Sequence, residues 1–204
     1  MPDEISFAPG TSPFRIKGTG YRGHMAYAAA NVPGGVDAMI AGLHDERLRT
    51  FFRQPFLASS WYDILPLLPA GRVCASLMQL GYDAYLRERT RAQARADLSG
   101  IYSVMLKVVS PESVALRLPR IVSQYFDFGR VETRRQGPRL VVCTSSGIPR
   151  VLLHWYETVV TSYVTIALDI AGAGPVTVEH EAPEPDGAVV GAASSRFRWS
   201  IRWG

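Results

Sequence analysis

Cysteine and histidine are scarce in this chain of 204 residues, and their spacing argues against a metal site. The two cysteines, Cys74 and Cys143, form no Cys-x-x-Cys pair, so a thiolate zinc site is not indicated. Both lie in apolar runs, which predicts buried free thiols in a reducing cytoplasm. None of the four histidines is paired as His-x-His or His-x-x-x-His. We therefore expect no metal.

Lysine and long apolar segments are scarce as well. Only Lys17 and Lys107 are lysines among the 22 basic residues, and the net charge of +4 is not concentrated in one block, so nucleic acid is not an expected partner. The apolar stretch Val151–Ala171 is interrupted by polar residues such as His154 and Glu157, which predicts a buried helix and no membrane span. The N-terminus lacks the apolar core of a signal peptide, so we expect a cytoplasmic protein.

The length and composition predict one globular domain. A chain of 22.4 kDa can bury a sizeable core. Its hydrophobic residues (47%) and charged residues (20%) are in the balance of a globular rather than a disordered protein. Residues 1–13 contain proline and glycine without a periodic pattern, which predicts a flexible tail. Residues 14–204 are expected to form a single α+β domain.

The first half of the chain predicts a short strand followed by helices. Phe14–Gly18 alternates apolar and polar residues, as a strand does. Arg22–Asn31 is rich in alanine and predicts a helix. Two short helices are expected at 35–43 and 45–52, the second with Asp45 as its N-cap.

The block from Phe51 to Arg89 has the most distinctive pattern. Ser59 or Ser60 should cap a helix that runs from Trp61 to Leu68, and the step at Pro69 should end it and start the next. One apolar face of this second helix would hold Val73, Leu77, Leu80 and Ala84.

Further helices are predicted before the pattern changes from helix to strand at Gly129. Arg87–Asp97 is charged and indicates a solvated helix, whereas Ile101–Val109 indicates a buried one. Ser110 should cap another helix with Pro111 at its first position, and Pro119 would be tolerated only with a kink. The inward face of this helix would hold Val114, Leu118, Ile121, Val122 and Tyr125.

From Gly129 onward the pattern indicates strands around one long helix. Strands are predicted at Arg130–Arg134 and Leu140–Thr144 as a hairpin, and at Pro175–Glu181 and Ser195–Trp203 on either side of a loop at 184–187. The helix Arg150–Ala171 should end at Gly172 and bury Val151, Leu152, Trp155, Val159, Tyr163, Ile166 and Ile170. The predicted fold class is α+β: a helical N-terminal half followed by a β-β-α-β-β antiparallel sheet packed on helices.

The order of several short motifs resembles a known family. These are Lys17-Gly18, Trp61-Tyr62, Leu80-Gly81-Tyr82-Asp83, the Pro111 helix, Tyr125-Phe126, the hairpin, His154-Trp155-Tyr156 and the strand ending at Trp203. They are similar to a paralogous myxobacterial family of about 200 residues that is a domain of unknown function. The likeness extends over nearly the whole chain.

More distantly, the layout resembles a superfamily of haem nitric-oxide-binding, vinyl-reductase-type and Bet3-like domains. That resemblance implies a non-catalytic ligand-binding or regulatory domain, with a hydrophobic small molecule or lipid bound between helices and sheet. The residues expected to line such a pocket are Trp61, Tyr62, Tyr125, His154, Trp155 and Tyr163. The haem-binding branch requires a proximal histidine and a Tyr-x-Ser-x-Arg motif, which this chain lacks. The cofactor is therefore unknown, and haem is possible but not favoured.

Three alternatives stay open. The aromatic residues, which fall at helical spacing, could be core packing alone. The chain could be a protein–protein interaction module acting as an oligomer, a homodimer for instance, with the strand Arg196–Trp203 pairing edge to edge with a partner. It could also be an enzyme, although neither a Ser-His-Asp order nor paired carboxylates indicate one.

The Gly18-x-Gly20-x-x-Gly23 spacing is similar to that of a phosphate loop. No βαβ unit follows it, however, and a turn with positive φ is the simpler interpretation.

Overall fold

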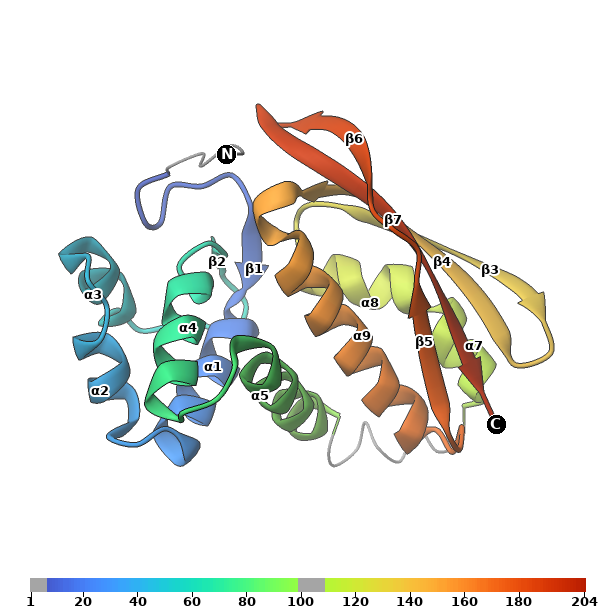
Figure 1. Cartoon of the computed structure of the whole chain (residues 1–204), viewed down its shortest axis with the longest axis horizontal. Coiled ribbons are helices and arrows are strands. Elements are labelled where there is room, and N and C mark those ends of the chain that lie inside the picture. Colours follow the sequence, from blue (N-terminus) through green and yellow to red (C-terminus); the bar gives the residue numbers. More distant parts are fainter. Residues whose placement is uncertain (1–6, 99–108) are drawn as a thin grey trace. The chain divides into compact units, whose positions relative to one another are not determined.

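The computed structural model describes residues 7–98 and 109–204, which fall into two compact units. The helical unit runs up to Gln93 and includes Tyr125–Asp127, and the sheet unit holds the other described residues from Ala94 onward (Figure 1). The predicted helix at 101–109 lies almost entirely outside the described residues. The expectation of a single domain after residue 13 stays a prediction.

The helical unit combines a two-stranded sheet with five helices. β1 (Arg15–Lys17) pairs antiparallel with β2 (Trp61–Asp63). The helices are α1 (Gly18–Asn31), α2 (Gly35–Ala41), α3 (Glu46–Phe52), α4 (Leu67–Leu77) and most of α5 (Tyr82–Asp97). The predicted first strand and the short helices after it are confirmed, with α1 starting four residues earlier than expected.

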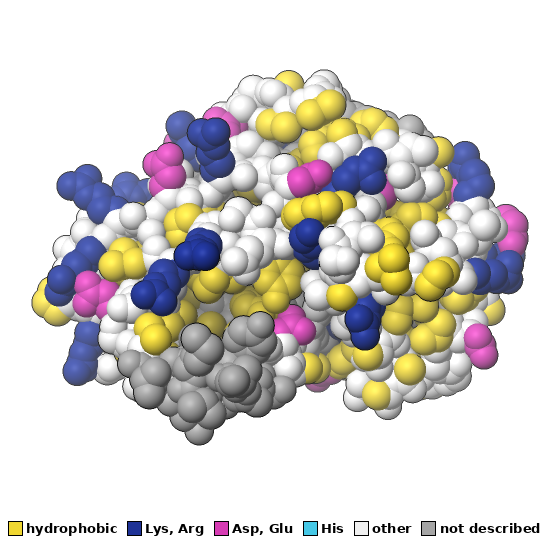
Figure 2. Space-filling model, turned by 180° about the vertical axis from the view of Figure 1, so that it is seen from behind, with side chains coloured by type: hydrophobic (Ala, Val, Ile, Leu, Met, Phe, Trp, Pro, Cys, Tyr) yellow, Lys and Arg dark blue, Asp and Glu magenta, His cyan; other side chains and the backbone are white. Residues whose placement is uncertain are grey.

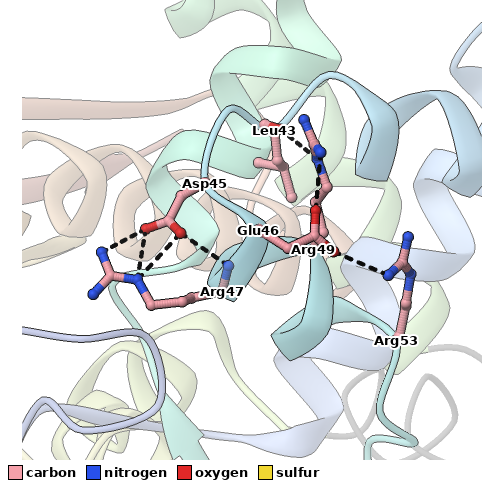
Figure 3. Close-up of polar contacts among 6 residues, drawn as sticks. All are labelled: Leu43, Asp45, Glu46, Arg47, Arg49 and Arg53. Atoms are coloured by element: carbon pink, nitrogen blue, oxygen red, sulfur yellow. Dashed lines mark hydrogen bonds and ion pairs between the residues drawn. The ribbon is translucent and has the colours of Figure 1, made fainter.

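The start of α3 confirms the predicted N-cap. The Asp45 carboxylate accepts a hydrogen bond from the Arg47 backbone N–H at 2.8 Å and pairs with its guanidinium (Figure 3). Within the helix, Glu46 pairs with Arg49 at 2.9 Å and with Arg53 at 3.3 Å. These ion pairs are exposed, so each contributes little to stability.

The prediction for Trp61 to Leu68 was wrong. Residues 61–63 form strand β2, because Ile16 of β1 pairs with Tyr62 and holds the segment extended. Spacing alone could not exclude a helix over so short an apolar run. Pro69 does not break a helix either, because it lies in the first turn of α4, where its missing N–H has no helical partner to lose.

The predicted single face from Val73 to Ala84 belongs to two helices. α4 ends at Leu77, and the chain turns at Gln79, whose φ of 56° is left-handed. The Leu80 N–H then donates to the carbonyl of Ala75 at 2.9 Å, a bond typical of a helix C-terminus. α5 is partly solvated as predicted, but Arg89 and Thr90 are buried.

The sheet unit contains five antiparallel strands in the order β3-β4-β7-β5, with β6 also pairing with β7. The strands are β3 (Arg130–Gly137), β4 (Leu140–Pro149), β5 (Val176–His180), β6 (Glu184–Val189) and β7 (Ala192–Trp203). The α+β fold class and the hairpin are confirmed. The predicted loop at 184–187 was wrong, because this segment is strand β6, so the sheet has one strand more than expected.

The strand β7 lies at the centre of the sheet. Along one edge, its C-terminal half pairs with β5 and its N-terminal half pairs with β6. Along the other edge it pairs with β4. Its alternation is confirmed: Phe197, Trp199 and Ile201 are buried, whereas Arg196, Arg198 and Arg202 are exposed. The predicted edge pairing of this strand with a partner was wrong, because both of its edges are already occupied.

Helices cover one face of the sheet (Figure 1). Ser110 caps α7 (Pro111–Leu116) as predicted, and the chain breaks at Arg117 before α8 (Leu118–Tyr125). The expected kink is therefore a complete break, which leaves Pro119 in a first turn.

The long helix α9 (Leu153–Ile170) follows a 3-10 turn at Arg150–Leu152 and ends before Gly172, which has the expected left-handed conformation. Its buried face is rotated from the prediction, because the 3-10 turn shifts the phase: Val151 is 48% exposed and Tyr156 is fully buried. The Tyr156 ring packs edge-on to Phe197 of β7 at 6.3 Å. Among the described residues, no helix has the length and apolarity to cross a membrane.

Candidate functional site

An aromatic cluster forms the centre of the helical unit. Tyr21 on α1 is fully buried and stacks on Phe56 at 4.4 Å with nearly parallel rings. Phe51, Phe52 and Tyr62 surround Tyr21 at 5.5 to 5.9 Å. The Tyr21 hydroxyl donates to the backbone carbonyl of Asp63 at 2.5 Å. The sequence prediction included Tyr62 but missed Tyr21 and Phe56, because only the tertiary fold brings these rings together.

The predicted residues Trp61 and Tyr62 are both half-buried on β2. The Tyr62 hydroxyl accepts a hydrogen bond from the Leu57 N–H at 2.8 Å, and the Lys17 ammonium lies 4.1 Å from the centre of the Trp61 ring. Tyr125 belongs to the same unit, next to Phe126, which forms a bridge with Ile16 of β1. The fold therefore brings these three predicted residues to one small sheet.

The other three predicted residues lie on α9 in the sheet unit. Trp155 is 3% exposed, Tyr163 is half-buried and His154 is exposed. Glu157, one turn after His154, is half-buried, and this burial raises the pKa of its carboxyl although His154 acts in the opposite direction. Ligand contact by any of the six residues stays a prediction.

The glycines at the start of α1 serve close packing. A Cβ on Gly18 would lie 1.9 Å from the Leu57 carbonyl oxygen, and one on Gly20 would lie 2.6 Å from Ile16. The Gly18 N–H donates to the Ser60 carbonyl at 2.8 Å, so it is not available to a phosphate. The prediction that this turn needs positive φ was wrong, because none of Gly18, Gly20 and Gly23 has one.

A chain of buried polar side chains links three helices of the helical unit. The Tyr85 hydroxyl on α5 lies 3.4 Å from Nδ1 of His24 on α1 and hydrogen-bonds Cys74 on α4. Arg89, 3% exposed, donates to the Gly20 carbonyl at 2.9 Å. Burial, and then the positive charge of Arg89, lower the pKa of His24 to about 3. The imidazole is therefore neutral at pH 7, and its Nε2 has no hydrogen-bond partner among the described residues.

Comparison with solved structures identifies the fold. A mutant Cs H-NOX domain aligns with a TM-score of 0.66, at 9% identity over 92% of this chain and 96% of that one. An oxygen-binding H-NOX domain related to soluble guanylate cyclases aligns with a TM-score of 0.65, at 10% identity over 92% of this chain and 95% of that one. This chain has the H-NOX fold. No family model and no curated protein matches it, so the likeness to the myxobacterial family stays a prediction.

The polar residues of β3 do not fit the haem that H-NOX domains are named for. The sequence contains no Tyr-x-Ser-x-Arg motif, and β3 has no tyrosine. The Thr133 hydroxyl donates to the Leu116 carbonyl at 3.2 Å, and the Arg135 guanidinium pairs with Glu112 at 3.0 Å. Both side chains are thus engaged with α7.

The possible axial donors fit no better. Burial raises the pKa of the Cys74 thiol, and it raises that of Cys143 to about 12, so neither is a thiolate at pH 7. The His24 ring is enclosed by Tyr85 and by Phe52, whose ring centre lies 6.2 Å away. The described residues contain no cluster of three or more metal-ligating side chains. The two thiols and His24 therefore offer haem no accessible axial ligand, and His154 is exposed on α9.

Proposed function

We propose that this chain is a non-catalytic ligand-binding or regulatory domain whose ligand is a hydrophobic small molecule or lipid and not haem. The observation that carries the proposal is the H-NOX fold, which covers 92% of this chain and 95% of a domain described as oxygen-binding. The misfit of the donor set to haem directs the proposal toward another ligand.

The aromatic side chains support an apolar ligand. Trp61, Tyr62, Tyr125 and Tyr163 are all half-buried, so each ring has one part in the protein and another that a ligand can cover. Aromatic rings bind apolar ligands through large contact areas, and the hydroxyls of tyrosine add orientation. These residues, together with His154 and Trp155, are the ones we propose to test first.

The test is native mass spectrometry of the purified protein with an absorption spectrum of the same sample, before and after addition of haemin. We expect an extra mass that organic extraction removes, and no Soret band in either spectrum. Tyr163→Ala and Trp61→Ala should lower the occupancy, whereas Tyr27→Ala, a half-buried tyrosine outside the predicted set, should not.

Two results would contradict the proposal. A mass equal to that of the polypeptide, in a protein that also fails to bind added fatty acids, would remove the ligand-binding assignment. A Soret band lost in His154→Ala or His24→Ala would show that haem binds after all. We also propose that the chain forms a homodimer, and the same mass spectrum measures this directly.

A further inference from the structure

The outer face of the sheet, opposite the helices, carries an arginine-lined track. A groove of about 800 Å³ crosses β3, β4 and β7 and is lined by Glu132, Thr133, Arg134, Arg135, Gln136, Val142, Thr144 and Arg198. A second groove, of about 330 Å³, lies between Thr144 and the connection from β5 to β6. Thr144 and Arg198 line both grooves, so the two form one continuous track.

The strand register explains how these side chains meet. Glu132, Thr144 and Arg198 are direct cross-strand neighbours on β3, β4 and β7, and Arg134 lies in the next row with Val142. Residues paired in this way point to the same face of a sheet. The alternation that buries Phe197 and Trp199 therefore sends the arginines of β7 outward, toward the track.

Two arginines in the track, Arg134 and Arg198, can bind an additional anion. Arg134 is exposed and has no ion pair among the described residues. Arg198 is 3.6 Å from Glu181, beyond the distance of a good hydrogen bond, whereas Arg196 is engaged by Glu184 at 3.0 Å. A guanidinium has five donors suited to a carboxylate, so Arg134 and Arg198 can each bind one.

Shape and charge select the kind of partner. The track is long and open on one side, and it would leave much of a small molecule in water, whereas small-molecule sites bury most of the ligand. Glu132, Glu181 and Glu184 lie between the arginines, so the track presents single cations and not the continuous basic strip that a nucleic-acid backbone requires. Phe197 and Trp199 of β7 are buried and offer no exposed base-stacking platform. Figure 2 shows acidic and basic side chains interspersed over the visible face, without one large basic patch.

We propose that this track binds an extended, carboxylate-bearing peptide segment of a partner protein. Arg134 and Arg198 bind acidic side chains of the segment, and the Thr144 hydroxyl between them binds its backbone. Val142 supplies the apolar contact at the centre. This binding surface is separate from the ligand proposed above, and neither assignment depends on the other.

The experiment uses the full-length chain and a fluorescein-labelled peptide of alternating glutamate and threonine, followed by fluorescence anisotropy at low and at physiological salt. We expect Arg134→Gln and Arg198→Gln each to weaken binding about threefold to tenfold, and the double variant to weaken it more. Arg22→Gln removes the same charge from an exposed position on α1 and should change the affinity less than about twofold. Circular dichroism of each variant checks that the fold is retained.

The following results would contradict the proposal. Equal weakening in Arg22→Gln and Arg134→Gln would mean that only net charge matters, and the track would lose its role. Absence of binding at low salt would have the same consequence. Inorganic pyrophosphate that displaces the peptide at a lower concentration than the free peptide does would assign the two arginines to a small anion. A dimer that dissociates on Arg134→Gln, measured by light scattering, would assign the face to a second copy of this chain.

Discussion

The two units of this protein differ in whether they bury ionisable side chains. The helical unit buries His24, Asp63 and Arg89, each at most 3% exposed, together with the hydroxyls of Ser12 and Thr90. The sheet unit keeps its charged side chains on an open face, where Arg134, Arg196 and Arg198 are exposed. Buried polar groups fix a structure, because each one is costly unless it is hydrogen-bonded. Exposed ones are free to meet a partner.

This difference separates two sorts of substitution. Substitutions inside the helical unit should strongly lower the free energy of unfolding, because the backbone and side chains there have no room to adjust. Changes on the outer face of the sheet should leave stability within about 0.5 kcal/mol and alter binding instead. The following predictions test that division from the largest expected effect to the smallest.

Gly18→Ala should produce the largest loss of stability. The new Cβ would lie 1.9 Å from the Leu57 carbonyl oxygen and 2.9 Å from the Tyr62 ring, so the backbone itself must move. We expect a loss of about 3 kcal/mol in the free energy of unfolding, measured by urea denaturation. Gly81→Ala is the matched control, because nothing lies within 4 Å of its Cβ position. Equal effects of the two changes would show that the turn before α1 is not close-packed.

Asp63→Ala should cost nearly as much. Its carboxylate, 1% exposed, accepts hydrogen bonds from the Ser12 hydroxyl at 2.6 Å and from the backbone N–H groups of Gly10 and Leu65 at 2.9 Å each. Removing it leaves several buried donors unsatisfied, so we expect a loss of about 2 to 3 kcal/mol. Limited proteolysis should then cut near residue 10 sooner than in the wild type. Asp37→Ala, on the exposed face of α2, should change the free energy by less than about 0.5 kcal/mol.

His24 should make the protein lose stability in acid. Its folded pKa of about 3 lies below the ordinary value of 6.5, so the unfolded chain binds the proton first and stability falls as the pH drops from about 6.5 toward 3. The slope contributed by this one group approaches about 1.4 kcal/mol per pH unit. His24→Leu should flatten the curve of unfolding free energy against pH in this range.

The control for this effect is Phe52→Leu, which disturbs the packing against the same ring without removing a titrating group. It should lower stability by about 1 kcal/mol at every pH and leave the slope unchanged. If His24→Leu kept the full slope of the wild type, acid sensitivity would have to come from another buried group, and His24 would not be held neutral in the folded protein.

How much of the fold could be predicted also differs between the units. The alternation of β7, the hairpin of β3 and β4 and the stop at Gly172 are local signals, and the structure confirms each of them. The strand β6 was missed because Pro185 and Gly187 are turn residues by their local preference. Pairing with β7, through a shift in register between Pro185 and Ala188, overrides that preference.

The helical unit was harder because its signals are not local. The segment Trp61–Asp63 becomes a strand only because β1, more than 40 residues earlier, pairs with it. The same reason applies to the candidate site, where the aromatic residues of β2 and α9 could be named from composition. The chain of His24, Tyr85 and Cys74 could not, because three different helices supply it. Spacing along the sequence carries no information on contacts of that range.

The smallest predicted effect is a gain in stability at the tip of the sheet. Val190 and Gly191 form the two-residue turn between β6 and β7, with φ of 48° and 78°, and the Val190 side chain is 69% exposed. A left-handed backbone is unfavourable for a β-branched residue, and this turn type prefers Asn-Gly. Val190→Asn should therefore raise the free energy of unfolding by about 1 kcal/mol. Val151→Asn replaces another exposed valine whose φ is not left-handed, and it should bring no gain. Equal results for the two valines would mean that the backbone strain at Val190 is relieved in solution. The contrast between a helical unit that cannot adjust and a sheet surface that can would then weaken.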